Sequence, residues 1–201
     1  MKSNEFLTED KLASPARMLT LLQQNCKSFL SQAGWDNPLY RGVSSLLPPV
    51  SIQTNRPGRA PTSTNKAISK LADDWFLEKT GVRYRSNAVF TSGNHSHSGS
   101  YGHVYIVYLI GDFKFCWSPI VEDMFMMISG LQPHVARRAT EPTQIPNHIK
   151  SEIVRLLGEA NYKTDDLVAA TCSNSEIMVH CSKYYLLDID TFKAVHALAT
   201  R

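Results

Sequence analysis

The feature that most constrains the fold is a change in the spacing of apolar residues, which occurs at Gly81. Before Gly81, apolar side chains recur every three or four residues, as in amphipathic helices. After it, apolar and polar residues alternate, as in strands that expose one face to water. Helices therefore come first and a run of strands follows, a pattern that disfavours a doubly wound parallel sheet. We expect an α+β domain with a mostly antiparallel sheet.

Two helices are expected in the first part of the chain. The first begins at Ser14-Pro15, because Ser can cap a helix and Pro suits its first position, and it ends at Gly34. The second ends at Gly81, since glycine readily terminates a helix. Between the two helices, residues 42–64 hold four prolines and few apolar residues. This stretch is predicted to be a long irregular loop.

The remainder of the chain is predicted to consist of strands with helices inserted between them. Gly111-Asp112 suits the tight turn of a hairpin. The polar stretch 131–147 includes three prolines and is predicted to be a second loop. The expected strands are 82–90, 103–110, 113–117, 176–181 and 183–189, and the expected helices are 119–128, 149–157 and 191–199.

The composition fits a globular protein and argues against several other classes. Of the 201 residues 43% are apolar, yet no apolar run approaches the roughly 18 residues of a membrane span, so no membrane partner is expected. A formal net charge of +3 is too small to indicate a nucleic-acid-binding protein. The first ten residues are polar and do not form a signal peptide, and the four cysteines form no CxxC pair. We therefore expect a reduced, cytoplasmic protein.

Two groups of residues could suggest a metal site or a thiol nucleophile. His95, His97 and His103 lie in or near a segment rich in Gly and Ser, without a cysteine or carboxylate close by. We expect a solvated loop there and no metal. Cys181 directly follows His180, and alternation along a strand would point their side chains to opposite faces. Cys181 is therefore predicted to pack in the core.

Three short segments carry side chains that packing alone does not explain. Arg41 closes an apolar stretch just before Gly42, and a guanidinium there suits a phosphate or carboxylate. The strand that includes Phe90 ends in Thr91-Ser92, which offers hydroxyl groups to a polar ligand. Glu176 starts an apolar strand, where glutamate is rare unless it is paired or catalytic. For each segment taken singly, a surface arginine, an ordinary turn or a solvent-facing glutamate is an equally good explanation.

Taken together and in this order, the three segments resemble the pattern of the ADP-ribosyltransferase superfamily. In that pattern an Arg, a Ser/Thr-Ser strand end and a Glu come from three separate strands. Other stretches resemble small transferase-like proteins of bacteria and their phages, and these stretches are residues 56–62, 85–91, 101–102, 117–123 and 176–185. The resemblance implies a catalytic domain over 39–201, with a split antiparallel sheet flanked by helices. Residues 1–38 lie outside the resemblance and are expected to form a helical segment packed on this core.

The resemblance implies a mono-ADP-ribosyltransferase that uses NAD as its substrate and needs no metal. Glu176 would accept a hydrogen bond from the ribose 2′-hydroxyl while the nicotinamide–ribose bond breaks through an oxocarbenium-like transition state. Arg41 would hold the diphosphate or the adenosine ribose. Ser92 would position the nicotinamide ribose and help to place the glutamate. Glu176, Arg41 and Ser92 are therefore the expected catalytic residues.

The resemblance also implies which residues bind NAD. Tyr101 would stack on the nicotinamide ring, although a tyrosine is at least as often part of a core. Arg59 and Arg85 would make further contacts with the phosphates. The full expected set is Arg41, Gly42, Arg59, Arg85, Thr91, Ser92 and Tyr101.

The sequence departs from the family pattern just before the expected catalytic glutamate. Many transferases that modify arginine have Glu or Gln two residues before that glutamate, where this chain has Asn174. The resemblance therefore leaves the acceptor open; we expect a protein, such as a host protein if the chain is a phage effector. Three alternatives remain: an NAD glycohydrolase, a catalytically inactive binding or inhibitor protein on the same fold, and a nucleic-acid- or nucleotide-processing member of that fold.

Overall fold

The computed structural model describes residues 14–59 and 64–201 of the chain. Within these residues, the centre of the molecule is a single sheet of five strands whose pairings are antiparallel. The strands are β1 (Leu39–Val43), β2 (Val50–Thr54), β3 (Val89–Ser92), β4 (His103–Trp117) and β5 (Glu176–Leu187). The structure thus confirms a mixed fold of helices and an antiparallel sheet.

The sheet closes on itself because its two long strands pair on both edges. One edge of β5 pairs with β4, and its other edge pairs first with β3 and then with β2. β1 pairs with the first part of β4 on one edge and meets β3 on the other, where Tyr40 faces Ser92. The ring of β1, β4, β5 and β3 brings the end of β3 and the start of β5 together, next to β1.

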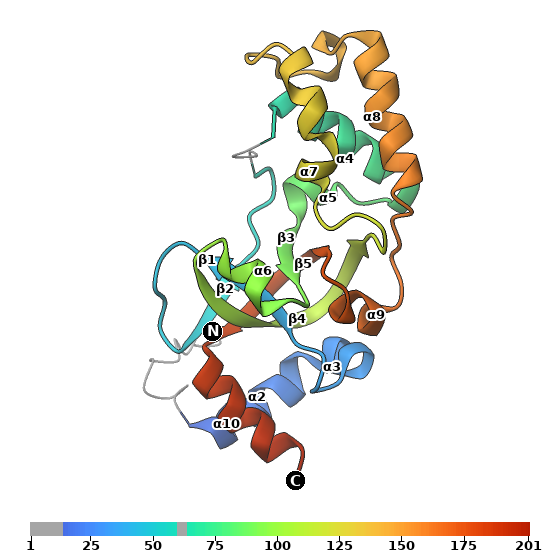
Figure 1. Cartoon of the computed structure of the whole chain (residues 1–201). Helices are drawn as coiled ribbons and strands as arrows, with labels where there is room; N and C mark the ends of the chain where they lie inside the picture. The colour runs from blue at the N-terminus through green and yellow to red at the C-terminus, as the bar shows by residue number, and fades with distance from the viewer. Residues whose placement is uncertain (1–13, 60–63) are drawn as a thin grey trace, which may run out of the picture.

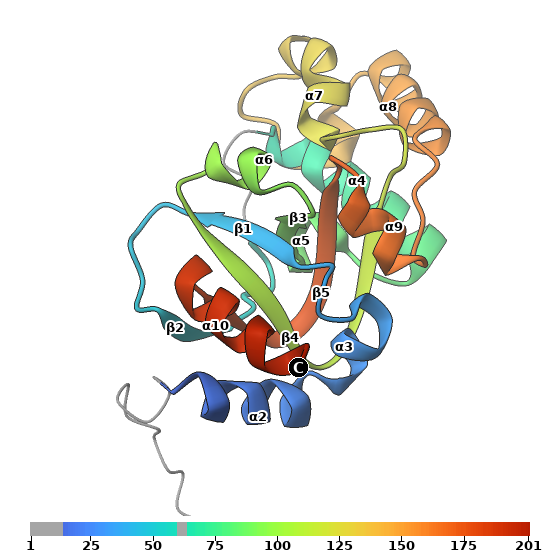
Figure 2. The same ribbon diagram turned by 60° about the horizontal axis from the view of Figure 1, so that its bottom comes forward.

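Two groups of helices lie at opposite ends of the sheet (Figure 1). One group consists of α2, α3 and α10, which Figure 2 shows close together beside the sheet. The other consists of α4, α5, α7 and α8, while α6 and α9 lie near the strand ends. The helices are α2 (Pro15–Asn25), α3 (Lys27–Ala33), α4 (Lys66–Thr80), α5 (Tyr84–Asn87), α6 (His95–Gly99), α7 (Met124–Ile128), α8 (Asn147–Glu159), α9 (Leu167–Cys172) and α10 (Ile189–Ala199), with 3-10 turns η1 (Ser129–His134) and η2 (Pro142–Gln144).

Each group of helices packs on the sheet through its own apolar core. Phe29 of α3 is buried in the first core, together with Val179 of β5. Phe76 of α4 and Ile153 of α8 are buried in the second core, together with Met178 of β5. Met178 and Val179 are neighbours in the chain but enter different cores, because successive residues of a strand face opposite ways. Burial of each of these side chains contributes about 1.5–3 kcal/mol.

The predicted hairpin at Gly111-Asp112 is wrong. Residues 103–117 form one continuous strand, in which pairing to β5 moves from Ile110 opposite Lys183 to Phe113 opposite Cys181. The strand therefore advances by three residues while its partner advances by two, which is a β-bulge. Gly111 has a φ of 71°, which suits a bulge as well as a turn. Pairing with the distant β5 decides between these two conformations, and the local sequence carries no sign of it.

The expected strand at 82–90 is also wrong in its first half. The structure has the short helix α5 there, and β3 begins only at Val89. Asp73 of α4 explains the difference, because its Oδ1 accepts hydrogen bonds from the backbone N–H groups of Arg85 (2.7 Å) and Ser86 (3.2 Å). These bonds hold a helical turn where alternation of apolar residues alone predicts a strand.

Several other boundaries differ from the sequence prediction. The first helix is two helices, because the backbone leaves the helical conformation at Cys26. The expected loop 42–64 contains the end of β1 and the whole of β2, while residues 60–63 lie outside the described part. The helix expected at 119–128 begins only at Met124, and the loop expected at 131–147 includes most of η1 and all of η2. The last strand ends at Leu187 and α10 begins at Ile189.

The cysteines are free thiols, and three of the four are buried. Cys181 packs in the first core as predicted, and burial raises the pKa of its thiol to about 12. A thiol of this kind stays protonated near neutral pH and is a poor nucleophile. Across the described residues, no helix is both long and apolar enough to cross a membrane.

Candidate active site

The strand pairing brings the three residues of the predicted catalytic set together. Ser92 ends β3 and stands opposite Glu176, the first residue of β5. Ser92 also stands opposite Tyr40 of β1, so Arg41 is one residue away along that strand. Arg41, Ser92 and Glu176 line one cavity of about 480 Å³. Residues far apart in the sequence therefore meet at one end of the sheet.

Six of the seven residues expected to bind NAD line this first cavity. They are Arg41, Gly42, Arg59, Thr91, Ser92 and Tyr101. Arg85 is the exception, because it lines a second cavity of about 740 Å³. The two cavities share Glu176, Tyr101, Phe90, Arg59 and His97. Glu176 therefore lies where the two cavities meet.

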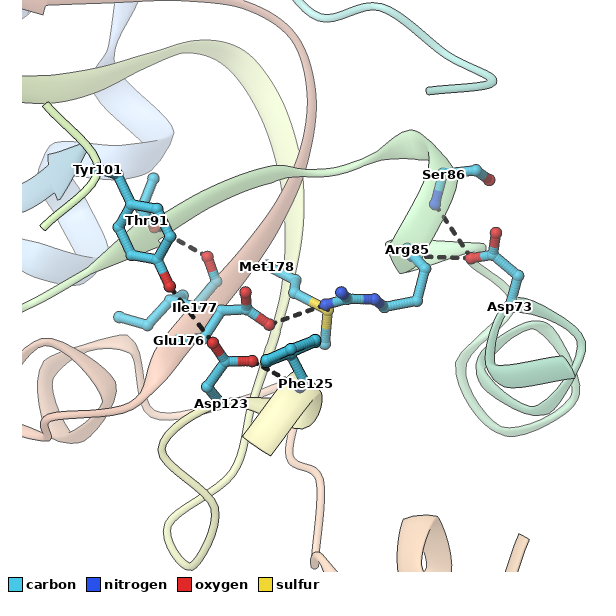
Figure 3. Close-up of polar contacts among 10 residues, drawn as sticks. All are labelled: Asp73, Arg85, Ser86, Thr91, Tyr101, Asp123, Phe125, Glu176, Ile177 and Met178. Carbon is cyan, nitrogen blue, oxygen red and sulfur yellow. Dashed lines mark hydrogen bonds and ion pairs between the residues drawn. The ribbon is translucent and has the colours of Figure 1, made fainter. Parts of the chain in front are cut away.

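Glu176 is an ionisable group in a largely buried position, with 17% of its side chain exposed. Its Oε1 accepts a hydrogen bond from Nη1 of Arg85 at 2.9 Å (Figure 3). Burial raises the pKa of Glu176 to about 7, the attraction of Arg85 opposes this rise, and the negative charge of Asp123 adds to it. A carboxyl group with a pKa near 7 can exist in either protonation state at neutral pH, which is typical of catalytic acids and bases.

Three arginines surround Phe90, a residue that was not among the predicted site residues. The guanidinium groups of Arg59 and Arg85 lie 4.5 and 4.7 Å from the centroid of its ring. Arg41 donates from Nη1 to the backbone carbonyl of Phe90 at 3.1 Å. Desolvation, and then the positive charges of Arg41 and Arg85, lower the pKa of Arg59. In the first cavity Arg41 and Arg59 outnumber the one carboxylate, that of Glu176, and this excess of positive charge suits a diphosphate.

The hydroxyl groups of Thr91 and Ser92 are engaged differently. Thr91 donates its hydroxyl hydrogen to the backbone carbonyl of Ile177 at 2.9 Å, so this group helps to hold β3 against β5. The hydroxyl oxygen of Ser92 accepts a hydrogen bond from the N–H of Asn94 at 3.1 Å. Ser92 therefore keeps a hydrogen that it can donate to a ligand, whereas Thr91 does not.

Tyr101 lies across the junction of the two cavities. Its side chain is 57% exposed, and its ring lies 5.8 Å from the ring of His97. Its hydroxyl lies 3.4 Å from Oδ2 of Asp123, a long hydrogen bond (Figure 3). Asp123 also caps α7, because its Oδ1 accepts a hydrogen bond from the N–H of Phe125 at 2.6 Å. An exposed aromatic ring in this place is available to stack on a planar ligand.

Gly42 is required by close packing around the first cavity. A Cβ atom built at Gly42 would lie 2.7 Å from Cβ of Tyr101 and closer still to the backbone oxygen of Ser98. Real Cβ atoms do not approach other atoms so closely. The absence of a side chain at Gly42 therefore allows the end of α6, and Tyr101 after it, to lie against β1.

Sequence reasoning missed Phe90, His97 and Asp123. His97 lies on α6 and not in the expected solvated loop. The side chain of Asn94 caps the first turn of this helix, because its oxygen accepts a hydrogen bond from the N–H of His97 at 3.1 Å. An Asn three residues before His97 is a helix-start signal that was available in the sequence. Asp123 is likewise the N-cap of a helix, but nothing in the sequence places it near Glu176, because the two residues meet only through the fold.

The described residues contain no group of three or more His, Cys, Asp or Glu side chains that could hold a metal ion. His95 and His97 lie on the short helix α6, whereas His103 begins β4. The ring of His95 packs instead against that of Tyr40 at 5.5 Å. The polar side chains that line the first cavity include arginines, a carboxylate and hydroxyls.

Comparison of the chain with models of protein families, with curated proteins and with solved structures found no match.

Proposed function

We propose that this protein is an NAD-dependent mono-ADP-ribosyltransferase. It would cleave the bond between nicotinamide and ribose and transfer ADP-ribose to a macromolecular acceptor, which we take to be a protein. The observation that carries this proposal is the convergence of Arg41, Ser92 and Glu176 from β1, β3 and β5 on one cavity. Their order in the chain also resembles that of the ADP-ribosyltransferase pattern.

The charges and hydrogen-bonding groups of the cavity fit the parts of NAD. The guanidinium groups of Arg41 and Arg59 suit the diphosphate, and the hydroxyl of Ser92 can donate to a ribose oxygen. The exposed ring of Tyr101 can stack on nicotinamide. Glu176, when ionised, stabilises the positive charge that develops on the ribose as the bond breaks. The cavity therefore contains a group of suitable chemistry for each expected interaction.

Protonation of Glu176 controls this chemistry. The ionised form stabilises the oxocarbenium-like transition state, whereas the protonated form does not. Because the pKa of Glu176 is about 7, the active form becomes dominant only as the pH rises above neutrality. The ion pair with Arg85 keeps the pKa from rising further.

A second candidate function is that of a catalytically inactive binding protein on the same fold. The same ion pair favours this alternative, because Arg85 already occupies Oε1 of the carboxylate that NAD would need. If Arg85 keeps this carboxylate oxygen to itself when NAD binds, NAD is bound without being cleaved. Catalysis and simple binding therefore make different predictions for NAD turnover.

The direct test is release of nicotinamide from NAD by the purified protein, with and without bacterial lysate as a source of acceptors. Wild type is expected to release nicotinamide, and Glu176→Gln is expected to be slower by roughly 100- to 10,000-fold. Glu78→Gln is the matched control, because Glu78 is an exposed residue of α4 whose one ion pair among the described residues is with Lys79. Stimulation by lysate would support a transferase, and release that needs no acceptor would indicate a glycohydrolase. No release under any condition would favour the inactive binding protein.

A further inference from the structure

We infer that the second cavity receives the acceptor, and that this acceptor is a polypeptide segment presenting a cationic side chain between apolar neighbours. In this arrangement Asp123 takes the proton that the acceptor loses. The inference rests on the proposed function, because it assumes that NAD is cleaved at Glu176.

Three exposed apolar side chains line the second cavity. Tyr101, Ile120 and Met126 are 57%, 66% and 67% exposed, and all three line this cavity. Aromatic and methionine side chains are enriched in surfaces that bind other proteins, and methionine adapts easily to different partners. Three exposed apolar side chains around one opening, one aromatic and one methionine among them, therefore favour a polypeptide over a small polar acceptor.

The charges at this rim favour a cationic side chain. Glu122 and Asp123 line the second cavity, and within the described residues neither forms a salt bridge. Glu176 differs from them, because Arg85 already neutralises it at 2.9 Å. The second cavity is lined by three carboxylates and by two arginines, Arg59 and Arg85. The carboxylates are in excess by one, and this excess attracts an arginine or lysine of an approaching segment.

A separate observation concerns an unpaired hydrogen-bond donor beside this cavity. Arg85 lines the cavity with only 9% of its side chain exposed, and its Nε has no hydrogen-bond partner among the described residues. Buried donors are nearly always paired in folded proteins. A backbone carbonyl of a bound polypeptide segment is an acceptor that could satisfy this N–H after a small movement of the guanidinium.

The position of Glu176 allows a nucleophile to meet the ribose of NAD. The two cavities meet at Glu176, so a ribose bound beside this residue in the first cavity is reachable from the second. Asp123 lines the second cavity. Among the described residues its Oδ2 makes only the 3.4 Å contact with Tyr101, so it can accept another hydrogen bond.

The transfer step balances without any further reactant. The bond between the ribose C1′ and nicotinamide breaks, and its electron pair leaves with nicotinamide, which becomes neutral. A nitrogen of the acceptor side chain forms the new bond to C1′ and loses one proton. Oδ2 of Asp123 accepts this proton and later releases it to water. Asp123 therefore acts as the base for the acceptor, while Glu176 stabilises the positive charge on the ribose.

The test uses labelled NAD and two synthetic peptides of equal charge, one with an arginine flanked by leucines and one with the same arginine flanked by serines. Wild type is expected to modify the leucine-flanked peptide roughly tenfold faster. Ile120→Ser combined with Met126→Ser should abolish this preference, whereas Leu46→Ser, at an exposed leucine outside both cavities, should keep it. Asp123→Asn should lower the ratio of transfer to NAD hydrolysis roughly tenfold or more, while Asn still caps α7.

The outcomes separate this inference from the proposed function. Equal modification of the two peptides, or a wild-type ratio of transfer to hydrolysis in Asp123→Asn, would overturn the inference while leaving NAD cleavage intact. If wild type cleaves no NAD, the proposed function fails, and calorimetric titration of the leucine-flanked peptide then tests the surface alone. Binding that is lost in the Ile120→Ser, Met126→Ser variant would support the docking surface, and no binding to wild type would overturn it.

Discussion

Replacement of Glu176 by Gln is expected to stabilise the protein at pH 8 and to leave its stability almost unchanged at pH 4. The pKa of Glu176 is about 7 in the fold and 4.5 for a free glutamate. That difference of about 2.5 corresponds to roughly 3 kcal/mol by which the fold disfavours the ionised form. Gln resembles the protonated form and avoids this cost.

The sign follows from proton binding in the folded and unfolded states. Between pH 4.5 and 7 the folded protein keeps a proton on Glu176 that the unfolded chain has lost, so stability falls as pH rises through this window. Below 4.5 both states are protonated and the contribution disappears. Above 7 the full cost is present, and roughly 3 kcal/mol corresponds to about 6–12 °C in Tm for a chain of this length.

The assay is thermal unfolding of wild type and Glu176→Gln from pH 4 to pH 8, with Glu78→Gln as a control at an exposed site. The difference in Tm between wild type and Glu176→Gln should grow with pH and level off above 7. The control should show no such trend. A difference that does not depend on pH, or a Glu176→Gln protein that is less stable than wild type at pH 8, would refute the reasoning.

Three further predictions follow from the packing and charge of the site. Arg85→Met removes the cation that lowers the pKa of Glu176. The acid limb of a pH–rate profile for nicotinamide release should therefore move to higher pH by roughly one unit or more. An unchanged acid limb would show that Arg85 does not act on this carboxyl group. Gly42→Ala places a Cβ against Tyr101 and Ser98. Denaturant unfolding should therefore show a free energy of unfolding lower by roughly 1–3 kcal/mol, and NAD binding should be weaker. Wild-type values for both quantities would contradict the close approach. In the native protein an aromatic disulfide reagent should modify the exposed Cys172 quickly. The buried Cys26, Cys116 and Cys181 should react only when the protein unfolds. Rapid modification of more than one thiol would contradict the described burial.

The sequence predicted those features that depend on nearby residues. Gly81 ends α4 in the left-handed conformation, as its place after an amphipathic stretch indicated. Gly34 ends α3 for a similar local reason. Glu176 begins a strand whose following residues are mostly buried, so its unusual position was visible in the apolar pattern alone. Chemical roles were therefore easiest to infer where a polar side chain interrupts such a pattern.

The features that sequence reasoning missed depend on contacts between distant segments. Asp73, which precedes residues 84–87 by more than ten positions in the chain, accepts the hydrogen bonds that hold these residues in a helix. Pairing with β5 makes Gly111 part of a bulge instead of a hairpin. Asp123 reaches the site because the backbone N–H of Glu176 donates to the carbonyl of Glu122 at 2.6 Å. None of these contacts leaves a trace in the local spacing of residues.

The central claim is that ionised Glu176, at the meeting point of two cavities, drives cleavage of NAD. The most direct measurement is the rate of nicotinamide release between pH 5 and pH 9 for wild type and Glu176→Gln. We expect the wild-type rate to rise with an apparent pKa near 7, and the variant to be slower by roughly 100-fold or more at pH 8 without this rise. Equal rates for the two proteins, or no release by wild type at any pH, would contradict the claim.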